Sequence, residues 1–134
     1  HRLDEQRVTI VKQLADDLPL LHLDAELMRN CLTNFITNAA QAMPEGGSIT
    51  LGAEWDSVPG WVRLSFADQG CGIAPEDLDK VFQPYFTSKD VGIGLGLAIT
   101  ERIVKEHGGE ILVASQPGQG TVFTVRLPME EATV

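Results

Sequence analysis

The sequence predicts a single α/β domain of two layers, in which a mixed β-sheet carries helices on one face. Its length of 134 residues suits one domain and leaves little room for a second. Several segments alternate apolar and polar residues as half-buried strands do, whereas two others repeat their apolar residues with the spacing of a helix. Since consecutive strands usually pair, the strands should form one sheet and the helices should cover it.

The first part of the chain is predicted to form a strand, a short extended stretch and the longest helix. Residues 8–14 (VTIVKQL) alternate, and 20–24 (LLHLD) follow Pro19. From residue 25 to 43 the period is helical, and Pro44 with the glycines after it ends the helix. The apolar positions of this helix are Leu27, Met28, Cys31, Leu32, Phe35, Ile36, Ala39, Ala40 and Met43.

The rest of the chain is predicted to hold a hairpin, two further helices and two closing strands. The hairpin strands, 48–55 (SITLGAEW) and 61–68 (WVRLSFAD), flank the turn signal Pro59-Gly60. The segments that follow are a short acidic helix over 75–81, a glycine-rich loop, a helix over 96–107, and strands at 110–115 (EILVAS) and 120–128 (GTVFTVRLP).

Composition and charge exclude several classes of protein. With 10 basic and 19 acidic residues the net charge is −9, which argues against binding to a nucleic-acid backbone. No apolar run approaches the ~20 residues that cross a bilayer and no signal peptide is visible, so we expect a soluble, cytoplasmic fragment without membrane contact. Cys31 and Cys71 lack the spacing and the neighbours of a zinc site, so both are expected to be reduced thiols.

Nine of the 13 glycines lie between Gly70 and Gly120, where they flank predicted strand and helix ends. Taken one pair at a time, they are explained by turns. Together, DQGCGI at 68–73 and GIGLGL at 92–97 indicate backbone that approaches a ligand closely. The second run is not a GxGxxG dinucleotide fingerprint, because its spacing differs and no strand precedes it. It opens a helix, however, and can present backbone N–H groups and a positive helix end to phosphate.

Three asparagines, Asn30, Asn34 and Asn38, recur every fourth residue of the long helix and form one stripe beside its apolar face. Asparagine costs up to ~0.7 kcal/mol relative to alanine inside a helix, so helix stability does not explain the stripe. One interpretation is a solvated or hydrogen-bonded helix flank. The other is a metal site, because amide oxygens are hard ligands of the kind that Mg²⁺ prefers.

These motifs together resemble the sequence boxes of the histidine kinases, from about residue 8 to 128. The N box is matched by NFITNAAQAMPEGGSI (34–49), the first glycine box by DQGCGI, the F box by VFQPYFTSK (81–89), the second glycine box by GIGLGLAIT (92–100) and the closing one by GQGTVFTVRLP (118–128). The boxes occur in the family's order, with HGGEI before the last. Chance production of the whole set is negligible.

The resemblance implies the Bergerat-type ATP-binding α/β sandwich that these kinases share with gyrase B, MutL and a heat-shock chaperone. The short link between Phe82 and Gly92 is similar to that of nitrogen-regulator kinases with a brief ATP lid. The implied function is to bind Mg·ATP and to transfer its γ-phosphate to a histidine on a separate phosphoacceptor domain in two-component signalling. Residues 8–128 would be this catalytic domain, 1–7 the end of a linker, and 129–134 a C-terminal tail.

Carried onto this chain, the resemblance implies a metal ligand and an adenine-binding carboxylate. Asn38 would ligate Mg²⁺, and Asn34 would support the phosphates or the metal. The Asp68 carboxylate would accept the exocyclic N6–H of adenine and repel the carbonyl oxygen of guanine. Thr121 would join the adenine network through its hydroxyl or a water. The full set implied to bind the nucleotide is Asn34, Asn38, Asp68, Gly70, Gly72, Ile73, Lys89, Gly92, Gly94, Leu95, Gly96, Leu97 and Thr121.

Because the chain is acidic overall, the positive charge needed near the γ-phosphate must come from a few local groups. Lys89 is the candidate, since it matches the lysine of the family's lid pattern. The catalytic set is thus Asn34, Asn38 and Lys89, although a solvated surface lysine is the plain alternative for the last. Gln41 stands where many relatives have Lys or Arg, and Ile93 where many have Thr. Phosphate binding should therefore depend more on Lys89 and on the partner domain.

The histidine that accepts the phosphate is expected on another domain. His1, His22 and His107 are not followed by an acidic residue, as the phosphoacceptor box requires. The implied partners are the phosphoacceptor domain of the same kinase and, indirectly, a response regulator. We expect the fragment to be monomeric and the full-length kinase to be a homodimer, with a membrane anchor elsewhere in the protein as an option.

Other functions remain open at this point. An ATPase or shape-switching module such as gyrase B or MutL shares the fold, but is expected to have a long lid and a transducer domain. A degenerate kinase domain used for protein contacts would lack nucleotide binding, against which the intact Asn38 and Asp68 argue. A serine kinase of the anti-sigma-factor type shares the same boxes and would differ in the residue that it phosphorylates.

Overall fold

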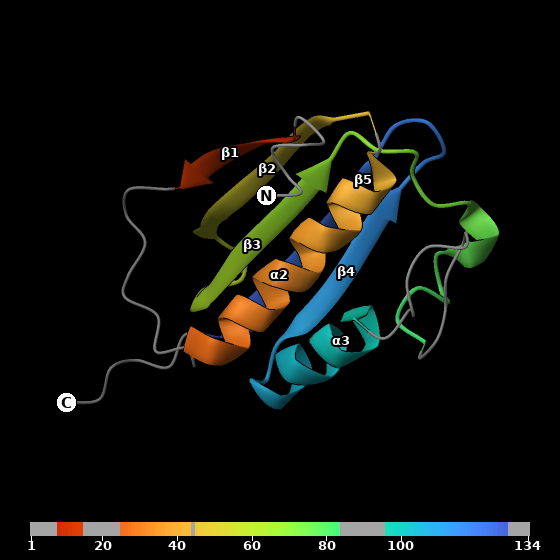
Figure 1. Ribbon diagram of the computed structural model, residues 1–134. Helices are drawn as coiled ribbons and strands as arrows, with labels where there is room; N and C mark the ends of the chain where they lie inside the picture. The colour runs from red at the N-terminus through yellow and green to blue at the C-terminus, as the bar shows by residue number, and fades with distance from the viewer. Residues whose placement is uncertain (1–7, 15–24, 44, 84–95, 129–134) are drawn as a thin grey trace.

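The computed structural model describes residues 8–14, 25–43, 45–83 and 96–128 of the chain, so the predicted stretch at 20–24 lies outside the described residues. Within them, a five-stranded sheet and two α-helices make two layers (Figure 1). The elements are β1 (Val8–Leu14), α2 (Ala25–Ala42), β2 (Gly47–Trp55), β3 (Trp61–Asp68), the 3₁₀ turn η1 (Pro75–Asp77), α3 (Gly96–Glu106), β4 (Glu110–Ser115) and β5 (Thr121–Pro128). Neither α2 nor α3 is both long and apolar enough to cross a membrane.

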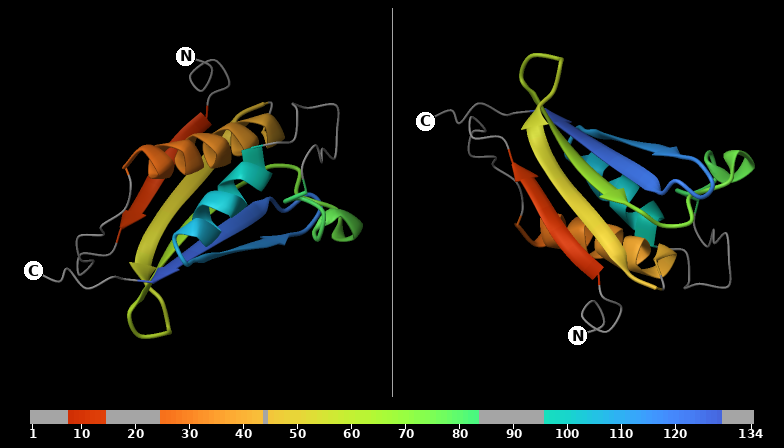
Figure 2. Two further views of the ribbon diagram at one scale, coloured as in Figure 1. Left: turned by 90° about the horizontal axis from the view of Figure 1, so that it is seen from below. Right: turned by 90° about the horizontal axis from the view of Figure 1, so that it is seen from above.

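The sheet is mixed, which confirms the prediction. Its strand order is β1-β2-β3-β5-β4, with β1 parallel to β2 and the other neighbouring pairs antiparallel. The predicted hairpin is the β2–β3 pair, and Gly60 in its turn has a φ of 83° that favours glycine. Both helices cover the same face of the sheet (Figure 2), as expected for the two-layer sandwich.

The acidic helix predicted over 75–81 is wrong, because only η1 is helical there. Ala74 at the N-cap offers no side-chain hydrogen bond, and no residue of η1 is buried. Further along, the Lys80 N–H donates to the Asp77 carbonyl, three residues back, as in a turn. Val81 is buried, but the first turn of the segment has neither a capping side chain nor a buried residue, so the contacts that stabilise a short α-helix are missing at its start.

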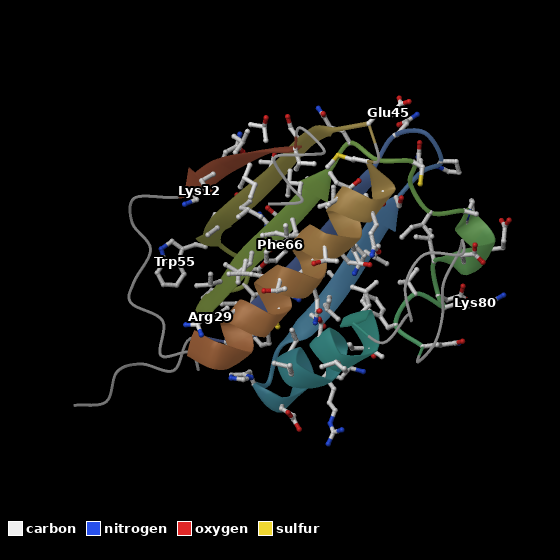
Figure 3. All side chains as sticks on the ribbon, in the orientation of Figure 1. Lys12, Arg29, Glu45, Trp55, Phe66 and Lys80 are labelled. Carbon is white, nitrogen blue, oxygen red and sulfur yellow. The ribbon has the colours of Figure 1, made fainter. Side chains whose placement is uncertain are left out.

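An aromatic cluster lies between α2 and the sheet. Phe35 of α2 stacks on Phe66 of β3, with ring centroids 4.4 Å apart, and lies 5.1 Å from the ring of Phe123 of β5. Figure 3 shows Phe66 beneath α2. Such pairs contribute ~0.5–1.5 kcal/mol each beyond the burial of their area. Because Phe35 is held in this cluster, the rotation of α2 about its axis is fixed, and with it the positions of the α2 asparagines.

Ion pairs stabilise the start of the β2–β3 turn and the last part of β5. The Arg126 guanidinium donates to the Asp56 carboxylate at 2.7 Å and also contacts Glu110. The Asp56 side chain is only 3% exposed, and the hydrogen bond from Arg126 lowers the pKa of its carboxyl group. This end of the sheet is therefore held by paired charges.

Candidate functional site

Asp68 is the last residue of β3, and its ladder partner is Thr121, the first residue of β5. Side chains alternate along a strand, so Asp68 shares the helix-covered face with the buried Phe66. Its Oδ1 accepts the Gly70 N–H at 2.8 Å, and the Thr121 N–H donates to the same carboxylate. Burial raises the pKa of Asp68, and the two backbone donors oppose part of that rise. The strand end thus holds a partly desolvated carboxylate in one orientation.

A hydroxyl group next to Thr121 joins the backbone of two loops. Ser115 Oγ, at the end of β4, donates to the Gly120 carbonyl at 2.7 Å and accepts the Ile73 N–H at 2.8 Å. It also lies 2.8 Å from the hydroxyl oxygen of Thr121. The loop that follows β3 is thereby attached to the β4–β5 hairpin where Thr121 begins β5.

Two glycines of these loops are required by close approaches of the backbone. Gly72 has a φ of 76°, and a Cβ atom there would clash with the carbonyl oxygen of Gln116. Gly120 has a φ of 84°, and a Cβ atom there would clash with the carbonyl oxygen of Asp68. The sequence predicts that Gly72 lets the backbone approach a ligand, and the structure adds an intramolecular reason for glycine at this position.

The same loop is attached to the C-terminal end of α2, as Figure 1 shows. The Cys71 N–H donates to the Ala42 carbonyl at 3.2 Å, and a Cβ atom on the buried Gly70 would lie 2.6 Å from Ala42 Cβ. Asn38, which is half-buried, precedes Ala42 by about one helical turn. The helix therefore carries Asn38 close to the loop that follows Asp68.

A buried hydrogen bond joins α2 to α3. The Asn34 amide donates from Nδ2 to the Thr100 hydroxyl at 3.0 Å, and Thr100 is 0% exposed. Because an unsatisfied buried polar group costs ~1–3 kcal/mol, this bond fixes the Asn34 side chain and the two helices relative to each other. Gly96, the first residue of α3, precedes Thr100 by about one turn. The start of α3 thus lies beside the helix that carries the asparagines.

Most of the predicted site residues that the structure describes meet at one end of the sheet. The loop and hairpin network contains Asp68, Gly70, Gly72, Ile73 and Thr121, and the two helices add Asn34, Asn38 and Gly96. Leu97 and Ile73 pack against the main apolar core, and Phe82 packs on Phe123. The side chain of Asn30 lies outside the described residues, as do Lys89, Gly92, Ile93, Gly94 and Leu95. Their roles stay predictions.

Sequence reasoning does not identify three residues of this site, Ser115, Gly120 and Thr100. The available signal for Ser115 is its position at the end of one predicted strand, opposite Thr121 at the start of the next. Gly120 belongs to the closing glycine box at 118–128, but the sequence analysis gives it no role of its own. Thr100 ends the second glycine box at 92–100, but its burial is not predicted, because a threonine in an amphipathic helix can face the core or the solvent.

This end of the sheet carries amide oxygens, which are hard ligands of the kind that Mg²⁺ prefers. Among the described residues, no three His, Cys, Asp or Glu side chains gather into a metal-binding cluster. Amide oxygens are present on the half-buried side chains of Asn34 and Asn38, and Asp68 adds a carboxylate. Mg²⁺ commonly takes one or two protein oxygens and completes its octahedron with water and substrate phosphate, so a small amide set suffices.

Comparison with known sequences gives consistent matches. Residues 23–131 match the model of the family described as histidine kinase-, DNA gyrase B- and HSP90-like ATPases. The signal transduction histidine-protein kinase AtoS of Escherichia coli K12 is 39% identical over 125 residues, covering 93% of this chain and 20% of AtoS. The sensor histidine kinase ZraS of the same strain is 46% identical over 114 residues, covering 85% of this chain and 24% of ZraS. The chain therefore spans less than a quarter of the length of either relative.

Solved structures match the fold over almost the whole chain. Full-length ShkA in complex with AMPPNP superposes with a TM-score of 0.88 at 33% identity, over 99% of this chain and 28% of ShkA. The nucleotide-free catalytic domain of the histidine kinase ThkA superposes with a TM-score of 0.82 at 29% identity, over 96% of this chain and 83% of that domain. The sandwich described above is thus the fold of histidine kinase ATP-binding domains.

The raised pKa of Asp68 predicts a pH dependence of stability. The folded state binds the Asp68 proton more tightly than the unfolded state, whose ordinary pKa is 3.8. The stabilisation from this group is therefore complete below that value and is lost as the pH rises through the folded-state pKa. The free energy of unfolding of the wild type, minus that of Asp68→Asn, should decrease as the pH rises. Urea unfolding at a series of pH values measures this difference.

Asp56→Asn is the control with the opposite sign. The lowered pKa of Asp56 means that its stabilisation is present above 3.8 and is lost as the pH falls through the folded-state pKa. The free energy of unfolding of the wild type, minus that of Asp56→Asn, should therefore increase as the pH rises. A difference for Asp68 that is flat, or that rises as it does for Asp56, would contradict the burial of the Asp68 carboxylate.

Proposed function

Because the chain belongs to the family of histidine kinase-, DNA gyrase B- and HSP90-like ATPases, we propose that it binds Mg·ATP and transfers the γ-phosphate to a histidine on a separate phosphoacceptor domain. The proposed catalytic domain comprises residues 8–128. Its curated relatives AtoS and ZraS are named as histidine kinases, which favours a kinase over an ATPase switch. ShkA, which superposes over nearly the whole chain, was solved with AMPPNP, an analogue of ATP, and this supports an adenine nucleotide as the substrate.

The observation that carries this proposal is the oriented carboxylate of Asp68. Two backbone N–H groups, from Gly70 and Thr121, hold it at the end of β3. An ionised carboxylate accepts hydrogen bonds only, so it suits the exocyclic N6–H of adenine and repels the O6 of guanine. The Thr121 hydroxyl next to it would extend the adenine network, directly or through a water.

The phosphates would lie beside the start of α3 and the asparagines of α2. Backbone N–H groups at Gly96 and Leu97 occupy a helix N-terminus, where the helix dipole favours an anion. Gly92, Gly94 and Leu95 would continue this contact in the lid, and Lys89 would supply a positive charge. Gln41 is exposed on α2 and carries no charge, so the chain gives the phosphates few cations of its own.

Asn38, supported by Asn34, would hold Mg²⁺ at the phosphates. A bound magnesium ion would neutralise charge that develops on the phosphate oxygens. The contribution of the chain is to fix the amides: Phe35 sets the rotation of α2, and Thr100 holds the Asn34 side chain. The metal-binding role is proposed for Asn38, and the catalytic role for Asn34, Asn38 and Lys89.

The accepting histidine would come from a partner domain. Of the histidines only His107 lies within the described residues, and its Nδ1 is 2.9 Å from the Ile103 carbonyl of its own helix. Phosphoryl transfer needs the accepting nitrogen in line with the γ-phosphorus, so the partner must bring it to the nucleotide. We propose that this partner is the phosphoacceptor domain of the same kinase, and that a response regulator receives the phosphate next. We further propose that the domain is cytoplasmic, that the fragment is monomeric and that the full-length kinase is a homodimer.

The magnesium role of Asn38 can be tested with a matched pair of asparagines. Asn38→Ala should weaken ATP binding in the presence of Mg²⁺ by about tenfold, roughly the loss of one hydrogen bond to a charged group, and should have little effect in EDTA. Asn30→Ala, on the same helix, should leave the affinity for ATP unchanged both with Mg²⁺ and in EDTA. Isothermal titration with and without Mg²⁺ makes the comparison. Equal losses for the two variants would favour a merely polar helix flank.

Transfer to a partner can be tested with radiolabelled ATP. The chain alone should form no stable phosphoprotein, because it lacks an in-line acceptor. Addition of the phosphoacceptor domain of the full-length kinase should give an acid-labile, base-stable phosphohistidine on that domain. Label on this chain alone, or an acid-stable phosphoserine on the partner, would contradict the proposed reaction.

A further inference from the structure

Ser115 is the point at which the two loops beside the proposed adenine site meet. It ends β4 directly opposite Thr121, and both side chains face the helix layer. Its half-buried hydroxyl oxygen has three polar neighbours at hydrogen-bond distance: the Ile73 N–H at 2.8 Å, the Gly120 carbonyl at 2.7 Å and the Thr121 hydroxyl at 2.8 Å. The sequence and the comparisons give this residue no role.

The directions of these three bonds follow from the number of protons. A serine hydroxyl has one proton to donate and two lone pairs that accept. The Gly120 carbonyl can only accept, and two oxygens 2.7 Å apart without a proton between them repel each other, so the Ser115 proton points to Gly120. The Ile73 N–H can only donate. The Thr121 hydroxyl must therefore donate its own proton to Ser115.

The Thr121 hydroxyl consequently has only lone pairs left for any other partner. Asp68, its ladder neighbour, accepts hydrogen bonds and is already oriented by the N–H groups of Gly70 and Thr121. The side chains of Asp68 and Thr121, the latter only 5% exposed, thus offer acceptors and no donor to a ligand. An exocyclic amino group, which offers N–H donors at a single position, fits these acceptors, whereas a carbonyl oxygen at the same position meets repulsion from both side chains.

We propose that Ser115 is a positioning residue that sets the polarity of the Thr121 hydroxyl, so that Thr121 and Asp68 together select a 6-aminopurine over a 6-oxopurine nucleotide. This inference rests on the proposed nucleotide binding and adds a residue that determines its specificity. Without Ser115, the Thr121 hydroxyl can rotate and donate to a carbonyl oxygen, directly or through a water. Discrimination would then depend on Asp68 alone.

The test compares the affinities for Mg·ATP and for Mg·ITP, whose purine carries O6 in place of the amino group and a proton on N1. Ser115→Ala should reduce the ratio of the two affinities by about three- to tenfold, the range of one neutral hydrogen bond. Ser65→Ala is the matched control, because Ser65 lies on the opposite face of β3 from Asp68 and should leave the ratio unchanged. A merely structural role of Ser115 would weaken both nucleotides equally and would overturn the inference.

Variants at Thr121 test the same hydroxyl if Ser115→Ala does not fold, which circular dichroism would reveal. Thr121→Val removes the acceptor and should reduce the ATP-to-ITP ratio, whereas Thr121→Ser keeps the hydroxyl and should preserve it. An unchanged ratio in Thr121→Val overturns the inference and leaves nucleotide binding intact. A wild-type chain that binds neither nucleotide contradicts the proposed function itself, so the two failures are distinguishable.

Discussion

The pairing of Asp68 with Thr121, at the ends of two neighbouring antiparallel strands, is the contact on which the rest of the site depends. It places a carboxylate beside a backbone N–H that orients it, and it brings the loop after β3 against the β4–β5 hairpin. Glycine at position 120 allows that approach, because a side chain there would clash with the Asp68 carbonyl. The burial that raises the pKa of Asp68 also removes water that would compete with a nucleotide base.

The second constraint is the fixed rotation of α2. The stacking of Phe35 on Phe66 turns one side of the helix to the sheet, and the bond between Asn34 and Thr100 attaches the adjoining side to α3. The amide groups are therefore positioned by packing that is independent of any ligand. Preorganisation of this kind lowers the entropic cost of binding, because few side chains need to be ordered when the nucleotide arrives.

Local patterns in the sequence predict most of this architecture, and the exceptions have physical causes. Alternation along 61–68 puts Asp68 on the same face as Phe66, and the helical period over 25–43 defines the asparagine stripe. These local patterns do not reveal that β5 lies between β3 and β4, because strand order depends on contacts between distant segments. The same limit hides Ser115 and Thr100, whose importance comes from partners elsewhere in the chain. The acidic segment 75–81 fails as an α-helix because its first turn has neither a capping side chain nor a buried residue.

The central claim, that Asp68 reads the adenine base, is tested most directly by calorimetric titration of Mg·ATP into the wild type and into Asp68→Asn. Loss of a hydrogen bond to a charged group costs ~1.5–3 kcal/mol, so the variant should bind ATP about 10 to 150 times more weakly. Far-ultraviolet circular dichroism should show that the variant remains folded. Equal affinity of the two proteins for Mg·ATP, with both folded, would remove Asp68 from the nucleotide site and contradict the account.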